Sequence, residues 1–165
     1  MECDAGAGAG GGGLLPTRGK PVDLGGCRLF FLDGGSMQVR LPLARGLSLK
    51  LAIRPVLVRA GWGTALLDCG PGERETAAWR RHGVRPPALP LVRQLERIGI
   101  SPEEVDLVFL SHLHFDHAGG ALRGGRPLFP RADLLLQERE WRRAARREGG
   151  RELLAYVNVP IKALV

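Results

Sequence analysis

Cysteine is scarce in this sequence, and so are histidine, tyrosine and long apolar runs. The three cysteines, Cys3, Cys27 and Cys69, are odd in number and widely spaced, and no two form a CxxC pair. This pattern indicates neither a disulfide framework nor a cysteine zinc knot, and it is typical of a protein in a reducing cytosol. No apolar run approaches membrane-spanning length, and the glycine-rich N-terminus lacks the basic start and apolar core of a signal peptide. We therefore expect a soluble, cytoplasmic protein without a membrane partner.

Lysine is rare as well: 3 lysines accompany 21 arginines, and the formal net charge is +7. Such a charge is compatible with nucleic-acid binding, but the arginines are spread over most of the chain. The densest group, in residues 139–147, alternates with Glu138, Glu140 and Glu148 at spacings that allow i,i+4 ion pairs. The pattern favours a solvated helix face over a phosphate-binding stripe, so nucleic acid is not the expected partner.

The length of 165 residues fits one domain, and a 44% hydrophobic content is enough for a buried core. Residues 1–20 are a low-complexity glycine and alanine lead that cannot bury enough apolar surface to offset its ordering entropy. We expect a disordered tail at 1–20 and one folded unit at 21–165.

Apolar patterns and turn residues within the folded unit predict several extended segments. These are 27–33, 36–43 with a break at Pro42, the two arms of a hairpin at 54–72, 105–111 and 132–137. The segment 105–111 is an unbroken apolar run, which predicts a strand buried on both faces. A strand of this kind delivers its C-terminal end to the edge of a sheet, where ligands commonly bind.

Helical periodicity predicts three helices, at 73–82, 88–98 and 138–147. The second is the strongest, because its apolar residues share one face and Gly99 follows as a stop. Between them, the sequence SPEE at 101–104 has the capping-box arrangement and predicts a single helical turn.

The sequence SHLHFDHAGG, residues 111–120, holds three of the four histidines of the chain. His112 and His114 are two positions apart, so on an extended segment their rings project to the same side and can share one metal ion. Asp116 and His117 follow where the chain should turn, and they can bind a second ion or complete the first site. Imidazole and carboxylate donors suit Zn²⁺ and similar divalent ions. A single histidine after a strand is usually not a ligand, but this cluster predicts a metal site.

These residues resemble a known family. The spacing His112-x-His114-x-Asp116-His117 is similar to the HxHxDH signature of the metallo-β-lactamase superfamily, and ALLDCGPG, residues 65–72, resembles the family's strand that ends in an Asp-x-Gly turn. The resemblance covers about residues 25–157. Within the superfamily, the sequence is similar to the branch of methyl-parathion hydrolases and quorum-quenching lactonases. It implies an α/β fold, the layered αββα sandwich, with a metal site at one edge of the paired sheets.

The resemblance also implies roles for individual residues. His112 and His114 would bind the first metal, and Asp116 and His117 the second, with two zinc or other divalent ions in a complete site. Asp116 could also orient the attacking water or pass a proton to the leaving group. Asp68 would steady the site from outside the ligand shell. An equally open interpretation makes Asp68 a turn-former before Gly70.

The sequence departs from the family in its C-terminal part. The family supplies a further histidine for the first metal, a bridging aspartate and a last histidine, yet no histidine follows His117 here. Asp133 is the only later aspartate, and it comes too early to match the bridging residue. We expect the chain to correspond to the first αβ half of the sandwich, as a fragment or shortened isoform, and its exposed sheet face to favour self-association.

Three functions stay open at this point. The first is a metal-dependent hydrolase that uses a metal-activated water on a small-molecule substrate with an ester-type bond, a lactone, thioester or phosphotriester. In that case the site is completed by more chain or by another copy. The second is a catalytically silent product that binds metal weakly or associates with a partner. The third, a nucleic-acid-processing member of the family, lacks a local aromatic and basic platform.

Overall fold

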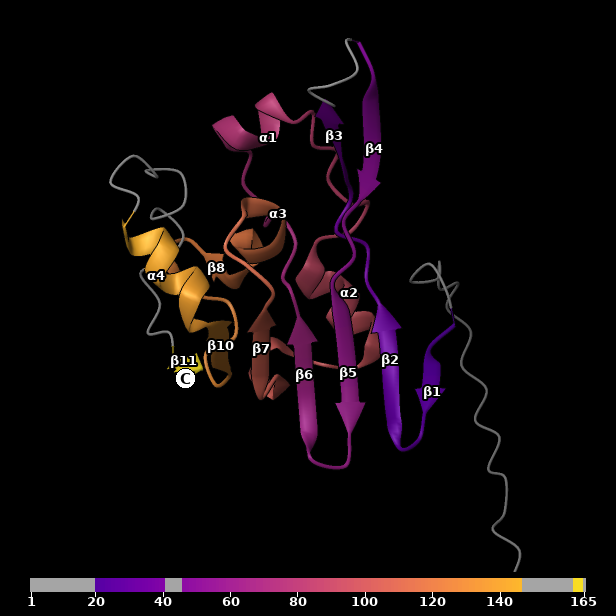
Figure 1. Ribbon diagram of the computed structural model, residues 1–165. Helices are drawn as coiled ribbons and strands as arrows, with labels where there is room; N and C mark the ends of the chain where they lie inside the picture. The colour runs from indigo at the N-terminus through magenta and orange to yellow at the C-terminus, as the bar shows by residue number, and fades with distance from the viewer. Residues whose placement is uncertain (1–19, 41–45, 147–161, 165) are drawn as a thin grey trace, which may run out of the picture.

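The computed structural model describes residues 20–40, 46–146 and 162–164 (Figure 1). The tail predicted at 1–20 lies outside the described residues except for Lys20. The main feature of the described part is a mixed seven-stranded sheet with the order β1-β2-β5-β6-β7-β10-β11. Its strands are Val22–Leu24 (β1), Cys27–Phe31 (β2), Val56–Ala60 (β5), Gly63–Leu67 (β6), Leu107–Leu110 (β7), Asp133–Gln137 (β10) and Lys162–Leu164 (β11).

The direction of the strands changes in the middle of the sheet. The strands β1, β2, β5 and β6 pair antiparallel with their neighbours. From β6 onward the pairing is parallel, because β6 pairs with β7, β7 with β10 and β10 with β11 in the same direction. Parallel neighbours bring their C-terminal ends to one edge of the sheet. The segments that follow β6 and β7 therefore lie next to each other, far apart in the sequence but close in space.

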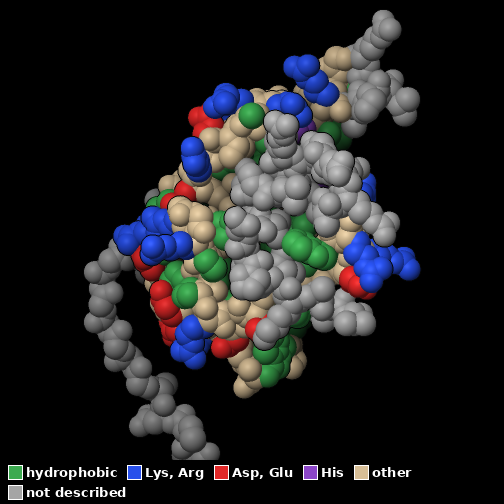
Figure 2. All heavy atoms as spheres, turned by 90° about the vertical axis from the view of Figure 1, so that its left-hand side faces the viewer, with side chains coloured by type: hydrophobic (Ala, Val, Ile, Leu, Met, Phe, Trp, Pro, Cys, Tyr) green, Lys and Arg blue, Asp and Glu red, His purple; other side chains and the backbone are tan. Residues whose placement is uncertain are grey.

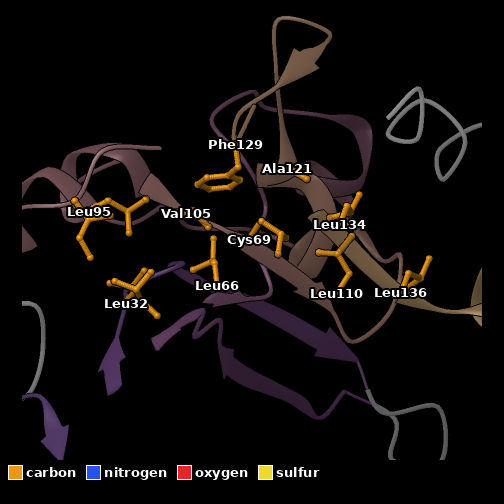
Figure 3. Packing of buried hydrophobic residues seen from close by; sticks show 14 of the residues in the cluster. Leu32, Leu66, Cys69, Leu95, Val105, Leu110, Ala121, Phe129, Leu134 and Leu136 are labelled. Carbon is orange, nitrogen blue, oxygen red and sulfur yellow. The ribbon is translucent and has the colours of Figure 1, made fainter. Parts of the chain in front are cut away.

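One face of the sheet carries the hydrophobic core. Leu57, Leu66 and Val108 are register partners on neighbouring strands, and each is buried. Leu95 projects from the helix α2 (Leu91–Ile98) into the same cluster and is fully buried. In Figure 3 the core extends from Leu95 at one end to Leu136 of β10 at the other. This layer of helix on sheet provides the rigid base for the segments that follow β6 and β7.

The helices begin and end at residues with identifiable caps. Helix α1 (Ala77–Arg81) is shorter than predicted and starts after Thr76, whose hydroxyl accepts a hydrogen bond from the Trp79 N–H. Helix α2 starts at Leu91, later than the predicted residue 88, because Pro90 and the preceding prolines keep the chain extended. It ends at Gly99 in the left-handed conformation, as predicted.

The turn predicted at SPEE is confirmed as the 3-10 helix η1 (Pro102–Glu104), in which the Glu104 carboxylate accepts a hydrogen bond of 2.7 Å from the Ser101 N–H. The hairpin of β5 and β6 and the strands β2 and β10 are confirmed as well. Helix α4 (Glu138–Arg146) also matches its prediction, and it carries the Arg142–Glu138 ion pair at i,i+4 spacing.

The prediction that the strand within 105–111 is buried on both faces is wrong. Strand β7 buries Val108 and Leu110, but Phe109 is 37% exposed. The cause lies in the neighbours, because Phe109 pairs in register with Leu67 on β6, which is 38% exposed on the same face. This second face of the sheet is apolar and open in the described structure.

Several short elements were not predicted. Strand β3 (Ser36–Arg40) lies within the extended segment predicted at 36–43, but β4 (Ser48–Ala52) was not predicted. The two strands pair in a separate hairpin that extends from one end of the sheet (Figure 1). Around the histidine cluster lie the single turn α3 (Phe115–Ala118), the 3-10 helix η2 (Gly119–Ala121) and the two-residue strands β8 (Leu122–Arg123) and β9 (Arg126–Pro127).

The described surface shows both signs of charge. In Figure 2 Lys and Arg side chains form separate groups, several of them next to Asp and Glu. Among the described residues, no helix is both long and apolar enough to cross a membrane.

Candidate metal centre

The histidine cluster begins where β7 ends. The chain bends at Ser111 after the strand, His112 and Leu113 have no regular secondary structure, and His114 precedes the α3 turn with extended backbone angles. The neighbouring strand β6 ends at Leu67, so Asp68 lies opposite this segment, and its N–H donates a hydrogen bond of 2.8 Å to the Phe109 carbonyl. Parallel pairing of β6 with β7 thus places Asp68 beside a cluster that follows it by more than forty residues.

His112 and His114 face each other through specific nitrogen atoms. The Nε2 atom of His112 lies 3.0 Å from the Nδ1 atom of His114, and the two rings meet edge to face. The ring of His117 lies 4.0 Å from the ring of His112 between centroids. The three imidazoles that the sequence analysis selected are therefore brought together.

Asp116 and His117 form a second pair of donors. The Nε2 atom of His117 lies 3.3 Å from the Oδ2 atom of Asp116. The α3 turn makes this contact possible, because its single helical turn places consecutive side chains around one loop, and the His117 and Ala118 N–H groups both donate to the His114 carbonyl. The Asp116 side chain is only 14% exposed.

The two pairs fit the geometry of a divalent metal. Two ligand atoms that each bind one tetrahedral zinc at its usual distance lie about 3.4 Å apart. The donor atoms of His112 and His114 are 3.0 Å apart, and those of Asp116 and His117 are 3.3 Å apart. Nitrogen and carboxylate oxygen are also the donor types that zinc accepts. Within the described ranges, however, no group of three such side chains is arranged around one point, so each pair offers only part of a ligand shell.

Asp68 and Ser111 contact the Nδ1 atoms of His117 and His112. The Nδ1 atom of His117 lies 2.7 Å from Asp68 Oδ2, and Nδ1 of His112 lies 3.1 Å from the Ser111 hydroxyl. That hydroxyl also lies within 3.0 Å of both Asp68 oxygens. If each Nδ1 carries its proton in these contacts, the Nε2 atoms keep free lone pairs for a metal. Carboxylate and hydroxyl support of this kind fixes the orientation of a ligating ring.

The two interpretations of Asp68 are both represented in its geometry. Asp68 is the only non-glycine residue with positive φ among the described residues, at 57°, and it lies two residues before the turn at Gly70 and Pro71. Its carboxylate also contacts Ser111 and His117. Ser111 was missed in the sequence analysis, although a serine directly after an apolar strand and before the histidines was a usable signal. Glu140 was missed too; its carboxylate accepts a long hydrogen bond of 3.5 Å from the Leu113 N–H.

The two glycines after the cluster, Gly119 and Gly120, allow two backbone segments to approach each other closely. Gly119 has ordinary helical angles, so tight turning does not require it. A Cβ atom on Gly119 would lie 2.5 Å from the Pro71 carbonyl oxygen, and one on Gly120 only 2.1 Å from that of Cys69. The glycines allow the backbone after β6 to pack directly against the backbone after α3.

The electrostatics of the site keep its carboxylates charged and one ring neutral. Burial raises the pKa values of Asp68 and Asp116, but hydrogen bonds with His117 and further local contacts bring each pKa below its usual value. Burial and the neighbouring His117 and His114 lower the pKa of His112. A neutral imidazole is the form that binds metal, so His112 is prepared for that role at neutral pH.

His117 behaves in the opposite way. Burial lowers its pKa, but hydrogen bonds to Asp116 and Asp68 and their negative charges outweigh burial and raise the pKa to about 9. In the metal-free chain, the His117 ring should therefore titrate near pH 9 in an NMR experiment, and Asp68→Asn should move the midpoint toward the ordinary value of about 6.5. The matched variant Asp106→Asn, at the other end of β7, should leave it unchanged.

The same shift predicts a pH dependence of stability. Because the pKa is higher in the folded chain, the contribution of His117 is complete below about pH 6.5 and is lost as the pH rises through about 9. Urea unfolding at pH 6 and pH 10 in the presence of a chelator should show a loss at pH 10 that is smaller in Asp68→Asn. An equal loss in both proteins would contradict the assignment.

Sequence and structure comparisons identify related proteins. Residues 52–123 match the sequence profile of the Metallo-beta-lactamase superfamily. The chain is 28% identical over 128 residues to the N-acyl homoserine lactonase AttM of Azorhizobium caulinodans, covering 69% of this chain and 47% of AttM. It is also 28% identical over 136 residues to the N-acyl homoserine lactonase AiiA of Bacillus thuringiensis subsp. kurstaki, covering 73% of this chain and 52% of AiiA.

Solved structures show the same relationship. A quorum-quenching N-acyl homoserine lactone lactonase superimposes with a TM-score of 0.64 at 26% identity, over 82% of this chain and 56% of that structure. The dizinc quorum-quenching lactonase AidC shares the fold, with a TM-score of 0.57 at 24% identity over 73% of this chain and 45% of AidC. The chain spans about half the length of the curated relatives it matches. Residues 52–123 thus match the metallo-β-lactamase superfamily, and the α/β fold of the described chain is similar to that of these lactonase structures.

Proposed function

We propose that this chain is part of a metal-dependent hydrolase of lactones and supplies those metal ligands that come from the N-terminal half of the fold. The observation that carries the proposal is the arrangement of four donors in two pairs, His112 with His114 and Asp116 with His117, at the end of β7. The lactonase names of the relatives support lactones as the substrate class, ahead of thioesters and phosphotriesters.

At such a site, the residues of the chain would have different roles in metal binding, ring orientation and proton transfer. Divalent ions held by the two pairs would supply an activated water and a positive charge for the developing oxyanion. Asp68 and Ser111 orient the rings of His117 and His112 through their Nδ1 atoms. Asp116 is ionised and largely shielded from solvent, so its carboxylate can hold a proton in transit to the leaving group.

The proposal predicts weak but specific zinc binding. With two donors in each pair, water must fill the rest of the ligand shell, so dialysed protein should retain less than one zinc per chain by elemental analysis. In a titration against a chelator of known affinity, His112→Ala and Asp116→Asn should each lower the zinc affinity by about tenfold or more. Asp106→Asn, the matched change outside the cluster, should leave it unchanged.

Two outcomes would contradict parts of this proposal. Zinc binding that is equal in wild type and His112→Ala would remove the metal site and favour a silent protein that acts through a partner. Two tightly held ions per chain would show that the site is already complete, with ligands contributed by a second copy.

A further inference from the structure

The fourth histidine of the chain, His82, lies at the metal loop although it comes thirty residues before it. Its ring stacks on the ring of Phe115, with centroids 5.7 Å apart and an angle of 26° between the planes. Phe115 is the first residue of the α3 turn and stands between His114 and Asp116 in the sequence. His82 therefore contacts the one residue of the HxHxDH segment that separates the two donor pairs.

The position of His82 is fixed from several sides. It is the C-terminal cap of α1, and its N–H donates to the Ala78 carbonyl. Its carbonyl accepts a hydrogen bond of 2.7 Å from the Gln38 N–H of β3. Helix α1 is itself anchored by Trp79, which is 5% exposed and whose indole N–H donates to the Pro71 carbonyl. These contacts hold the backbone of His82 in place, so its ring can support Phe115.

The other contacts of the α3 turn are at its C-terminal end, where Asp68 and Ser111 contact the His117 ring. The element is a single turn of four residues, Phe115–Ala118, and a helix of this length is not stable without contacts. Among its residues only Ala118 is buried, and the Phe115 ring is half-buried. The Cys69 N–H bonds to the His117 carbonyl and secures the end of the turn. The stack on His82 secures its beginning.

We propose that His82 is a positioning residue for the metal centre: by stacking on Phe115 it holds the α3 turn so that Asp116 and His117 face each other as donors. The role requires a flat ring rather than an ionisable group, because the contact is ring on ring. The proposal rests on the proposed metal site for its consequence, but the order of the α3 turn can be measured without metal.

The first experiment measures amide hydrogen exchange in the metal-free chain. The His117 and Ala118 amides report the turn, and the Val108 amide in β7 reports global unfolding in the same sample. His82→Ala should speed exchange at the two turn amides about threefold to tenfold relative to Val108, the range expected for one aromatic pair. His82→Phe should restore the wild-type rates, because it keeps the stack and removes the ring nitrogens.

The second experiment measures zinc affinity by competition with a chelator. His82→Ala should lower the affinity by a similar factor, and His82→Phe should restore it. Phe115→Leu should match the loss in His82→Ala, and the double variant should show no further loss, since both changes remove one contact.

The outcomes separate this inference from the proposed function. Wild-type zinc binding with no effect of His82→Ala on exchange or affinity would overturn the positioning role alone. Equal losses in His82→Ala and His82→Phe would also overturn it, because the ring nitrogens and not the stack would then matter. Absence of zinc binding in the wild type would overturn the proposed function, while the exchange rates would still decide whether His82 orders the turn.

Discussion

Joined to the C-terminal half of a lactonase relative, the chain is expected to hydrolyse N-acyl homoserine lactones at least about 100-fold faster than the 165-residue chain does alone. The described residues place only two donors at each position, and no histidine follows His117 in the sequence. Displacement of reacting groups by about 1 Å already costs on the order of 100-fold in rate, and an incomplete ligand shell leaves the metal less constrained than that. The 165-residue chain should therefore act little faster than free zinc.

In the joined protein, His112→Ala and Asp116→Ala should return the rate to that background, because each removes one member of a donor pair. Initial rates of lactone opening, followed by proton release at fixed pH, would measure the effect. Asp106→Asn is the control that keeps both pairs, and circular dichroism would show that each variant is folded.

The opposite results would be informative. A joined protein that binds zinc but opens no lactone, thioester or phosphotriester, and is unaffected by both substitutions, would replace hydrolysis with a binding role. Zinc-dependent turnover by the 165-residue chain that is lost in His114→Ala would instead show that a second copy completes the site.

Much of this site could be predicted because its donors are adjacent in the sequence. His112, His114, Asp116 and His117 lie within six positions, so the spacing alone indicated that they could meet. Their partners come from distant segments. Asp68 meets His117 only because β6 and β7 pair in parallel, and this register is a property of the whole sheet.

The position of His82 shows more clearly what the sequence alone cannot predict. Its sequence context, after a short run of arginines, gives no sign of a metal site. It reaches Phe115 because α1 is anchored by Trp79 and because Gln38 of β3 bonds to its carbonyl. Local periodicity cannot predict contacts that depend on three elements at once. The one-turn helix α3 was not predicted for the same reason, because it depends on contacts with distant segments.

The error at β7 has a related cause. An unbroken apolar run identifies a strand, but the run cannot tell which side of the strand a neighbouring layer covers. Phe109 and its partner Leu67 belong to a row of apolar register partners that crosses the sheet on the open face. The row consists of Phe31, Val56, Leu67, Phe109 and Leu135. This face is apolar and open among the described residues, and the chain spans about half the length of the curated relatives it matches.

We propose that the 165-residue chain self-associates through this row, with a second copy as the partner. Phe31, Leu67 and Phe109 are 43%, 38% and 37% exposed, and contiguous apolar surface of this kind marks an interface in soluble proteins. Burial of a Leu or Phe side chain stabilises an interface by about 1.5–3 kcal/mol. The double variant Leu67→Ser/Phe109→Ser should therefore weaken association by about 100-fold or more.

Sedimentation equilibrium over a range of protein concentrations would measure this effect. The matched control is Trp62→Ser, which removes a larger and more exposed apolar side chain, 64% exposed, from the turn between β5 and β6 rather than from the row. It should leave the association constant nearly unchanged, since the turn is outside the proposed interface. A wild-type chain that sediments as a single monomer and melts in one sharp transition would show instead that the open face needs no partner. Association that Trp62→Ser weakens as much as the double variant would place the contact elsewhere.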